Sequence, residues 1–279
     1  MSLFIASLNS GSNGNCYYAG NQQGAVLIDA GISCRETEKR MKRLGLSIQN
    51  VKAIFISHEH IDHIRGMQGI ATKHNIPVYI TAGTLKRSGI VMGNHLIKIF
   101  KAGEDVQIGT MKVNAFLKLH DAADPHSFTV SGNGVTIGVF TDIGTPCDQL
   151  ISNFKKCHAA FLESNYDETM LDQGSYPIYL KNRIRGGQGH LSNRQALELF
   201  MTHRPAHMTH LLLSHLSQNN NTPELVNATF SPHAREMNII IASRYNETEL
   251  FEVHGSKAIT PAKVIVKSTQ PKAVQATLF

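Results

Sequence analysis

The sequence predicts an α/β fold whose strands come mostly early and deliver polar side chains at their ends. Three observations support this prediction. Short β-rich apolar runs alternate with turn residues, helical patterns are interleaved with them, and the later apolar runs each end in a polar residue. Hydrophobic residues make up 42% of the chain and charged residues 17%, which is typical of a globular protein rather than a disordered chain or a coiled coil.

The expected elements follow one another along most of the chain. Period-two patterns bounded by turn residues predict the strands, and helical spacing with N-cap residues predicts the helices. Strands are expected over residues 4–8, 25–29, 53–57, 78–81, 111–116, 127–130, 136–141, 159–163, 211–215 and 238–242, and helices over 35–44, 67–74, 145–155, 194–202 and 224–230.

The 279 residues predict one folded domain, residues 1–256, and a flexible tail, residues 257–279, rich in Lys, Ala, Thr, Gln and Pro. The start of the sequence has no basic and apolar segments of a signal peptide, and no run of about 18 apolar residues occurs. We therefore expect a cytoplasmic protein with no membrane partner. The four cysteines form no C-x-x-C pair, which predicts reduced, mostly buried thiols.

Charge and histidine content narrow the class of function. The net charge of +6 favours an acidic partner such as nucleic acid. The 15 histidines, several of them beside Asp, Glu or Gly at predicted strand ends, favour metal chemistry.

One short segment carries most of the potential metal ligands. The apolar run 53–57 leads directly into His58, His60, Asp62 and His63. Imidazole nitrogens and carboxylate oxygens suit Zn²⁺, Mn²⁺ or Fe²⁺, and a short loop can direct alternate side chains to two neighbouring ions. The alternative interpretation, a solvated polar loop that happens to hold three histidines, does not explain why an apolar strand leads directly into the loop. The H-E-x-x-H pattern of a zincin protease is missing.

The motif His58-x-His60-x-Asp62-His63 resembles the signature of the metallo-β-lactamase superfamily, which implies a four-layer αββα sandwich and a metal-dependent hydrolase. Asp29 is similar to the family's structural aspartate. His120, Asp142 and His215 resemble the family's remaining metal ligands. The resemblance implies two divalent ions, Zn or Mn with Fe as a further candidate. By it, the first ion is held by His58, His60 and His120, the second by Asp62, His63 and His215, and Asp142 bridges them.

Two residues outside this ligand set indicate the bond that is cut. Glu163 and His190 resemble the pair found in phosphodiesterase branches such as tRNase Z. That resemblance implies catalytic roles for His190, Glu163 and Asp62: a metal-bound hydroxide attacks phosphorus, and His190, oriented by Glu163, protonates the departing sugar oxygen. The alternative is that His190 has no catalytic role and only lies next to the N-cap of the following helix. Because Ser192 or Asn193 could cap that helix, His190 would be free to point into the site.

The segments 7–16, 29–35, 120–125, 189–193 and 216–221 together resemble the YycJ/WalJ (VicX) family. The resemblance implies a 5′ to 3′ exonuclease of DNA repair acting on double-stranded DNA. Only 72 residues, 143 to 214, lie between Asp142 and His215, too few for an inserted β-CASP domain, and no protruding tRNA-binding arm is evident. Tyr166 stands where relatives can carry a histidine, and it receives no role.

Basic residues around the glycine-rich stretch 186–189 are expected to contact nucleic acid. They are Lys181, Arg183, Arg185 and Arg194. The basic run in 35–43 is expected to be a solvated helix face. The turn at 10–15 fits either a phosphate site or a simple hairpin.

The last residues, Gln275, Leu278 and Phe279, resemble the short peptide with which bacterial DNA polymerases and repair proteins bind the sliding clamp. A disordered linker before two apolar anchors is a suitable physical setting for such a peptide.

Other functions stay open at this point. The substrate could be RNA, a small cyclic phosphodiester or a thioester, although the Glu163 and His190 pair favours a phosphodiester over a thioester. A non-enzymatic DNA- or clamp-binding module with a vestigial site is disfavoured by the full set of seven ligands.

Overall fold

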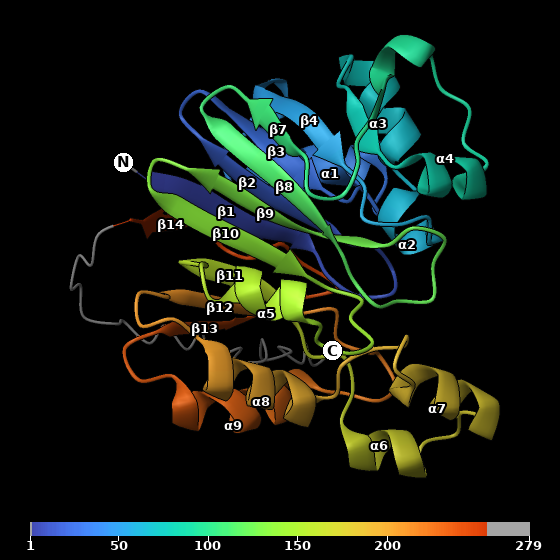
Figure 1. Ribbon diagram of the computed structural model, residues 1–279, viewed down its shortest axis with the longest axis vertical. Helices are drawn as coiled ribbons and strands as arrows, with labels where there is room; N and C mark the ends of the chain where they lie inside the picture. Colours follow the sequence, from blue (N-terminus) through green and yellow to red (C-terminus); the bar gives the residue numbers. More distant parts are fainter. Residues whose placement is uncertain (1, 256–279) are drawn as a thin grey trace, which may run out of the picture.

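Two seven-stranded mixed sheets form the centre of the molecule in the computed structural model, which describes residues 2–255 (Figure 1). The first sheet has the order β14-β1-β2-β3-β4-β5-β6, and the second has the order β13-β12-β11-β10-β9-β8-β7. The strands of the first sheet are β1 (Ser2–Asn9), β2 (Cys16–Asn21), β3 (Gly24–Ile28), β4 (Val51–Phe55), β5 (Val78–Ile80), β6 (Ile97–Ile99) and β14 (Phe251–His254). Those of the second sheet are β7 (Asp105–Ile108), β8 (Met111–Leu117), β9 (His126–Gly132), β10 (Val135–Phe140), β11 (Ala159–Glu163), β12 (His210–Ser214) and β13 (Asn238–Ile241).

Helices cover the outer face of each sheet. Those packed around the first sheet are α1 (Cys34–Arg43), α2 (Ile61–Ile64), α3 (Met67–His74) and α4 (Ala82–Ser88), with the 3₁₀ turns η1 (Ile48–Asn50) and η2 (Asn94–Leu96). Those on the side of the second sheet are α5 (Asp148–Phe154), α6 (Glu168–Gln173), α7 (Ile178–Arg185), α8 (Asn193–His203) and α9 (Pro223–Phe230), with η3 (Ser231–His233). Within residues 2–255, no helix has the length and apolar character needed to cross a membrane.

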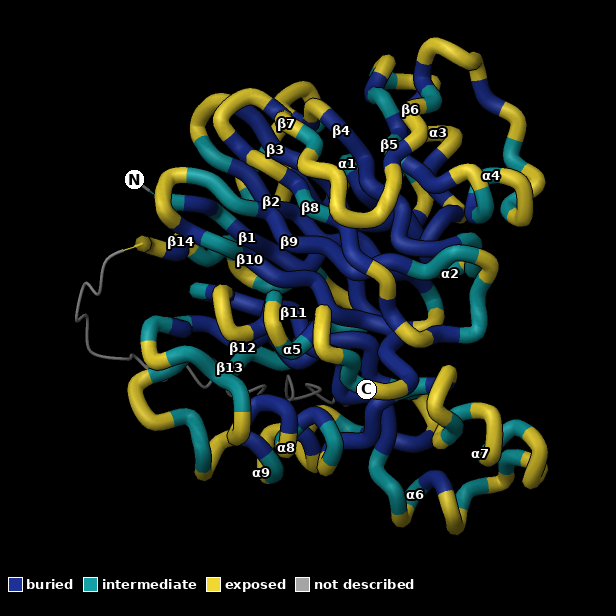
Figure 2. The backbone as a smooth tube through the Cα atoms, viewed as in Figure 1, coloured by how far each residue is buried: buried dark blue, intermediate teal, exposed yellow. Residues whose placement is uncertain are grey.

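The core lies in three layers, as Figure 2 shows by the dark blue strands between partly exposed helices. Between the two sheets, Phe55 of the first sheet contacts Phe128 of the second edge to face, and Tyr17 contacts Phe161, with ring centroids 5.8 and 4.9 Å apart. Every residue of β3 and β11 is buried, because each strand has a packed layer on both faces. The predicted four-layer αββα sandwich is therefore confirmed.

The parallel strands of each sheet position the site. In the first sheet β3, β4, β5 and β6 run parallel, and in the second β10, β11, β12 and β13 do. The carboxyl ends of parallel strands lie along one edge of a sheet, where ligands of open α/β sheets bind. All ten predicted strands and all five predicted helices overlap observed elements. The strands β2, β6, β7 and β14 and the helices α2, α4, α6 and α7 were not predicted.

The predicted solvated face of α1 is wrong for Arg40. This side chain is buried, forms an ion pair with Glu36, and donates hydrogen bonds to Leu8 O, Asn9 Oδ1 and Tyr245 O. Its guanidinium has five donors in a fixed fork, so one residue can satisfy several carbonyls at the edge of the first sheet. Arg40 therefore fastens α1 to the end of β1 and to the distant loop at Tyr245.

The cysteines are free, as predicted, but only half of them are buried. Cys16 and Cys157 are buried, and burial raises the pKa of both thiols, whereas Cys34 and Cys147 are partly exposed.

Candidate metal centre and proton-donating pair

The loop between β4 and α2 carries the densest group of polar side chains. The apolar residues of β4 are buried between a sheet neighbour on each side, so the chain emerges at the strand end with His58 already inside the molecule. Ser57 Oγ donates to Asp29 Oδ2 at 2.8 Å and lies 2.8 Å from His58 Nδ1. Asp29, at the end of the neighbouring strand β3, thus anchors the start of this loop, the structural role predicted for it.

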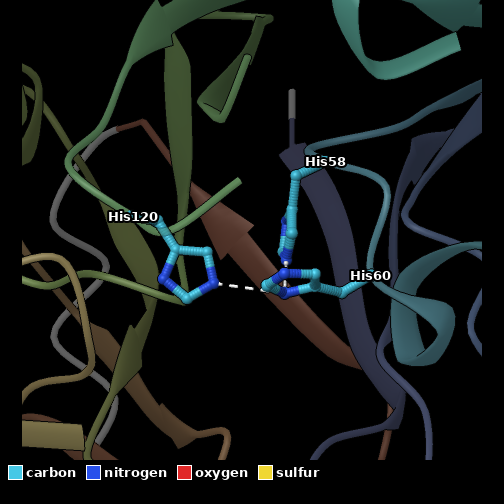
Figure 3. A group of neighbouring side chains, drawn as sticks. All are labelled: His58, His60 and His120. Atoms are coloured by element: carbon cyan, nitrogen blue, oxygen red, sulfur yellow. Dashed lines mark hydrogen bonds between the residues drawn. The ribbon is translucent and has the colours of Figure 1, made fainter. Parts of the chain in front are cut away.

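Three histidines converge at one side of the site, as Figure 3 shows. His58 Nε2 lies 3.0 Å from His60 Nδ1, which lies 3.3 Å from His120 Nε2. Burial lowers the pKa of His58, and burial lowers that of His120 to about 3, so both rings are neutral at ordinary pH. Neutral imidazoles that point their nitrogens at one another offer lone pairs to a shared cation.

Asp62, His63 and His215 form a second group of potential ligands next to the three histidines. Asp62 Oδ2 is 3.5 Å from both His63 Nε2 and His215 Nε2. Asp142 lies toward both groups, since its Oδ2 is 3.2 Å from His63 Nε2 and its Oδ1 is 3.9 Å from His120 Nε2. The structure therefore brings together all seven predicted ligand residues, in sets of donor atoms that could hold a metal ion.

The hydrogen bonds of the histidine Nδ1 atoms that face away from the centre of the site test whether these residues fit a metal. His58, His63, His120 and His215 each have a partner at Nδ1; in that order the partners are Ser57 Oγ, Asp29 Oδ2, Gly189 O and Glu163 Oε1. Such partners fix the tautomer of metal-ligating histidines and direct Nε2 inward. Among residues 2–255, the buried His215 Nε2 has no hydrogen-bond partner, which costs about 1–3 kcal/mol unless another group binds it. The residues fit a divalent metal.

Three of these side chains stand on strained backbone. Asp29, Asp142 and His215 have φ angles of 61°, 57° and 58°, and they follow β3, β10 and β12 at once or within two residues. A left-handed conformation is unfavourable for residues other than glycine, and it persists where the surrounding structure requires it, often at functional sites. The turn out of each strand is thereby bent toward the site.

Glu163 ties the metal centre to His190. Its Oε1 accepts hydrogen bonds from His190 Nδ1 at 2.8 Å and from His215 Nδ1 at 2.9 Å. Its Oε2 accepts the backbone N–H groups of Ile143 and Leu191 at 2.7 and 3.1 Å. Burial alone would raise the pKa of Glu163, but His190 and His215 outweigh it and hold this pKa at about 2, so the carboxylate stays ionised.

The alternative role of His190 as a helix-capping neighbour is not needed. Ser192 is the N-cap of α8: its hydroxyl accepts from Gln195 N, and the Gln195 side chain accepts from Ser192 N in a capping box. His190 lines a cavity of about 310 Å³ together with His60, Asp62 and Asp142. With Nδ1 committed to Glu163, its Nε2 is the ring nitrogen available to a molecule in the cavity.

Of the four predicted nucleic-acid-contacting cations, three lie on α7 and the fourth, Arg194, lies at the start of α8. Arg183 lines the cavity and pairs with Asp121. Arg185 pairs with Asp172 and Arg194 with Glu168, each at 2.9 Å, and Lys181 donates to Asp172 O. Their contact with nucleic acid stays a prediction. Tyr166 is buried and forms an isolated bridge with Ser192.

Sequence reasoning missed two residues that support the site. Asn15 Nδ2 lies 3.1 Å from both Asp62 Oδ2 and His63 Nε2, so the turn at 10–15 forms part of the metal centre's surroundings. Lys118 is buried, burial lowers its pKa, and its Nζ donates to Thr141 O at 2.8 Å. Lys118 precedes His120 by two positions, and the period of two along extended chain could have revealed that both point inward.

Gly31 lies where the segment after β3 passes close to the backbone of the loop that carries His58 to His63, and a side chain would not fit there. A Cβ at this position would lie 1.6 Å from Asp62 O. We expect Gly31→Ala to weaken zinc affinity by about tenfold or more, as disturbed surroundings of metal ligands do, and to lower the free energy of unfolding by about 1–3 kcal/mol. Chelator competition and urea unfolding measure the two effects. Gly69→Ala in α3, where the added Cβ would meet only Cys34 Cβ at 3.5 Å, is the matched control, and equal behaviour of the two variants would contradict the expectation.

Comparisons with known proteins agree with this geometry. Residues 25–216 match the family model of the β-lactamase superfamily domain. The chain is 33% identical over 267 residues to exodeoxyribonuclease YycJ of Bacillus anthracis, covering 95% of this chain and 99% of that protein. It is 29% identical to exodeoxyribonuclease WalJ of Streptococcus pneumoniae serotype 2, strain D39, over 80% of this chain and 84% of that protein.

A solved structure shares the fold. The metallo-β-lactamase fold protein YhfI from Bacillus subtilis superposes with a TM-score of 0.68 at 14% sequence identity, covering 90% of this chain and 100% of that chain. The match of the family model over most of the chain and the identity to YycJ over nearly its full length lead to one conclusion. The chain belongs to the metallo-β-lactamase superfamily of metal-dependent hydrolases and, within it, to the YycJ/WalJ family.

Proposed function

We propose that this protein is a dinuclear metal-dependent phosphodiesterase that degrades double-stranded DNA from its 5′ ends in DNA repair. The observation that carries the proposal is the contact of His190 with Glu163 at the wall of the cavity that also holds Asp62 and Asp142. The names of the two curated relatives, both exodeoxyribonucleases, support DNA as the substrate.

The two groups of ligands would hold one ion each. His58, His60 and His120 form the first set, Asp62, His63 and His215 the second, and Asp142 reaches toward both. When bound, Zn²⁺ or Mn²⁺ ions supply Lewis-acid stabilisation of charge on the phosphate and lower the pKa of water. The choice between zinc, manganese and iron is part of the proposal, because ligand type alone does not discriminate among them.

His190 would act as the general acid. Its Nδ1 donates to Glu163, which fixes the orientation of the ring. As an oxygen from water bonds to phosphorus and the bond between phosphorus and the sugar oxygen breaks, the proton on Nε2 would pass to that departing oxygen, and the next water would return a proton to the ring. Arg183, which lines the cavity, and Lys181, Arg185 and Arg194 would contact phosphates of the bound strand.

The pair of Glu163 and His190 also ranks the alternatives. A thiolate leaving group needs little protonation at neutral pH, whereas an alkoxide needs it strongly, so the pair favours phosphodiesters over thioesters. RNA and small cyclic phosphodiesters have the same kind of leaving oxygen. They are therefore separate outcomes of the experiment rather than exclusions.

The experiment compares end-labelled duplex DNA, single-stranded DNA, RNA and a cyclic phosphodiester, each with Mn²⁺ or Zn²⁺. We expect loss of duplex DNA from the 5′ end, dependent on added metal. Cleavage of RNA or of the cyclic diester in preference to duplex DNA would replace the proposed substrate. Failure of the metal-loaded protein to cut any of these substrates would overturn the proposal.

A clamp-binding role for Gln275, Leu278 and Phe279 lies outside the described residues, and it stays a proposal from the sequence. We expect immobilised sliding clamp to retain the full chain and to release a variant truncated after residue 274. Equal retention of both forms would reject this role.

A further inference from the structure

A second cavity adjoins the metal-centre cavity. It has a volume of about 290 Å³ and is bounded by the loop after β13, which includes Arg244 and Tyr245, and by Ser10. Leu216, Ser217 and Gln218 line both cavities. A molecule too large for the first cavity can therefore extend into the second by passing this three-residue segment.

Arg244 presents an unneutralised cation there. Its Nη2 donates to Ser12 Oγ at 3.2 Å, and its Nη1 is buried without a hydrogen-bond partner among residues 2–255. No carboxylate of the described residues forms an ion pair with it, in contrast to Arg183 and Arg185 on α7. A buried guanidinium nitrogen without a partner is unfavourable, and phosphate oxygens match its geometry.

The position of Arg244 is built into the fold. A Cβ on Gly11 would lie 3.3 Å from Arg244 Cβ, and Asn13 Nδ2 donates to Arg244 O at 2.8 Å. The buried Arg40 holds Tyr245 O at 2.9 Å, and Arg43 forms an ion pair with Glu247. The backbone that carries Arg244 is thus fastened on two sides, and the hydrogen bond from Nη2 to Ser12 Oγ holds the guanidinium itself.

Tyr245 completes the arrangement. Tyr245 is among the most exposed large hydrophobic residues of the described part of the chain, at 67%, although its backbone is held by Arg40. An exposed aromatic ring beside an arginine is the combination with which proteins hold one base by stacking and its phosphate by charge.

We propose that Arg244 and Tyr245 form a subsite for one phosphate and one base of a polynucleotide strand whose scissile phosphate lies in the metal-centre cavity. This inference rests on the proposed function and extends it to a defined contact away from the reacting atoms. The phosphate is either the 5′-terminal monoester or an internal diester, and both match the guanidinium.

Binding to labelled duplex DNA tests the subsite in a His190→Ala background, in which cutting is slow enough for the DNA to stay intact during a short measurement. We expect Arg244→Gln to weaken binding about fivefold to twentyfold and to reduce the slope of log Kd against log salt concentration by about 1, the amount for one phosphate contact. Tyr245→Ala is expected to weaken binding about fivefold or more with an unchanged slope, because stacking carries no charge.

Arg235→Gln is the matched control, since this exposed arginine lies before β13, at the opposite end of that strand from Arg244. It should leave both the affinity and the slope unchanged. Parallel measurements with 5′-phosphorylated and 5′-hydroxyl duplexes assign the phosphate: a loss confined to the phosphorylated duplex indicates the terminal monoester, and an equal loss indicates an internal diester.

An Arg244→Gln protein with a normal unfolding midpoint, unchanged affinity and an unchanged salt slope would overturn the subsite. The proposed function is tested separately, by cleavage with the wild-type protein. A wild type that degrades DNA beside an Arg244→Gln variant that binds normally therefore rejects the subsite alone. Absence of duplex binding by the parent protein rejects both.

Discussion

Replacing Asp142 with alanine is expected to lower the rate of DNA degradation by about 10³-fold or more and to reduce the bound metal from two ions to one or none. The carboxylate is buried, and its oxygens lie 3.2 Å from His63 Nε2, 3.4 Å from His215 Nδ1 and 3.9 Å from His120 Nε2. Its removal takes away a carboxylate that reaches toward both ligand groups. Metal content by mass spectrometry and the end-labelled duplex assay measure the two losses.

The backbone at Asp142 requires a second variant. Its φ of 57° is unfavourable for alanine, whereas asparagine tolerates it and removes only the negative charge. Asp142→Asn should therefore lose metal and activity while keeping a normal unfolding midpoint. Asp148→Ala, at an exposed acid six positions later, is the matched control. Full metal content in Asp142→Asn would remove this residue from the ligand set.

Replacing His190 with alanine is expected to lower kcat on duplex DNA by about 10²- to 10⁴-fold, the usual contribution of a general acid. The metal content should stay nearly unchanged, because His190 lies outside the set of seven proposed ligands, although its ring packs beside those of His120 and His215 and shares Glu163 with His215. Single-turnover rates and metal analysis of the same preparation separate the two properties. His95→Ala, at an exposed histidine in η2, controls for the loss of an imidazole.

The identity of the leaving group provides the sharper test of the acid role. Nitrophenolate departs without a proton, so the defect of His190→Ala on thymidine 5′-(4-nitrophenyl phosphate) should shrink to less than about tenfold. An equal defect on DNA and on the nitrophenyl ester would show that His190 positions the phosphate instead of protonating the sugar oxygen.

Much of the metal centre could be predicted because its ligands obey local rules. His58, His60, Asp62 and His63 lie within six residues after an apolar strand, so they needed no knowledge of distant contacts. The more distant His120, Asp142 and His215 each follow a predicted strand, and the carboxyl ends of parallel strands converge. The structure accordingly places these residues together, although their binding of ions stays a prediction.

Contacts between distant residues could be predicted only where the family resemblance indicated them. The contact of Glu163 with His190, 27 positions away, was expected in this way and is present, whereas its second contact, with His215 52 positions away, was not predicted. Arg40 looked like one cation in a solvated run, and its carbonyl partners, such as Tyr245 O 205 residues away, are visible only in the folded chain. The strand β14 was missed for the same reason, since its four residues become a strand by pairing with β1.

The distribution of the ligands over the two sheets has a consequence for how the protein is assembled. His58, His60, Asp62 and His63 follow a strand of the first sheet, whereas His120, Asp142 and His215 follow strands of the second. Neither half of the chain can complete a binding site alone, so an ion that binds the finished site adds its binding energy to the docking of one sheet on the other, about 2.7 kcal/mol at a free concentration of 100 times Kd. During synthesis the last ligand, His215, emerges more than 150 residues after the first, His58. If the seven residues bind metal as proposed, loading can be completed only after His215 has emerged, and chelation should loosen the packing between the two sheets before it unfolds either one.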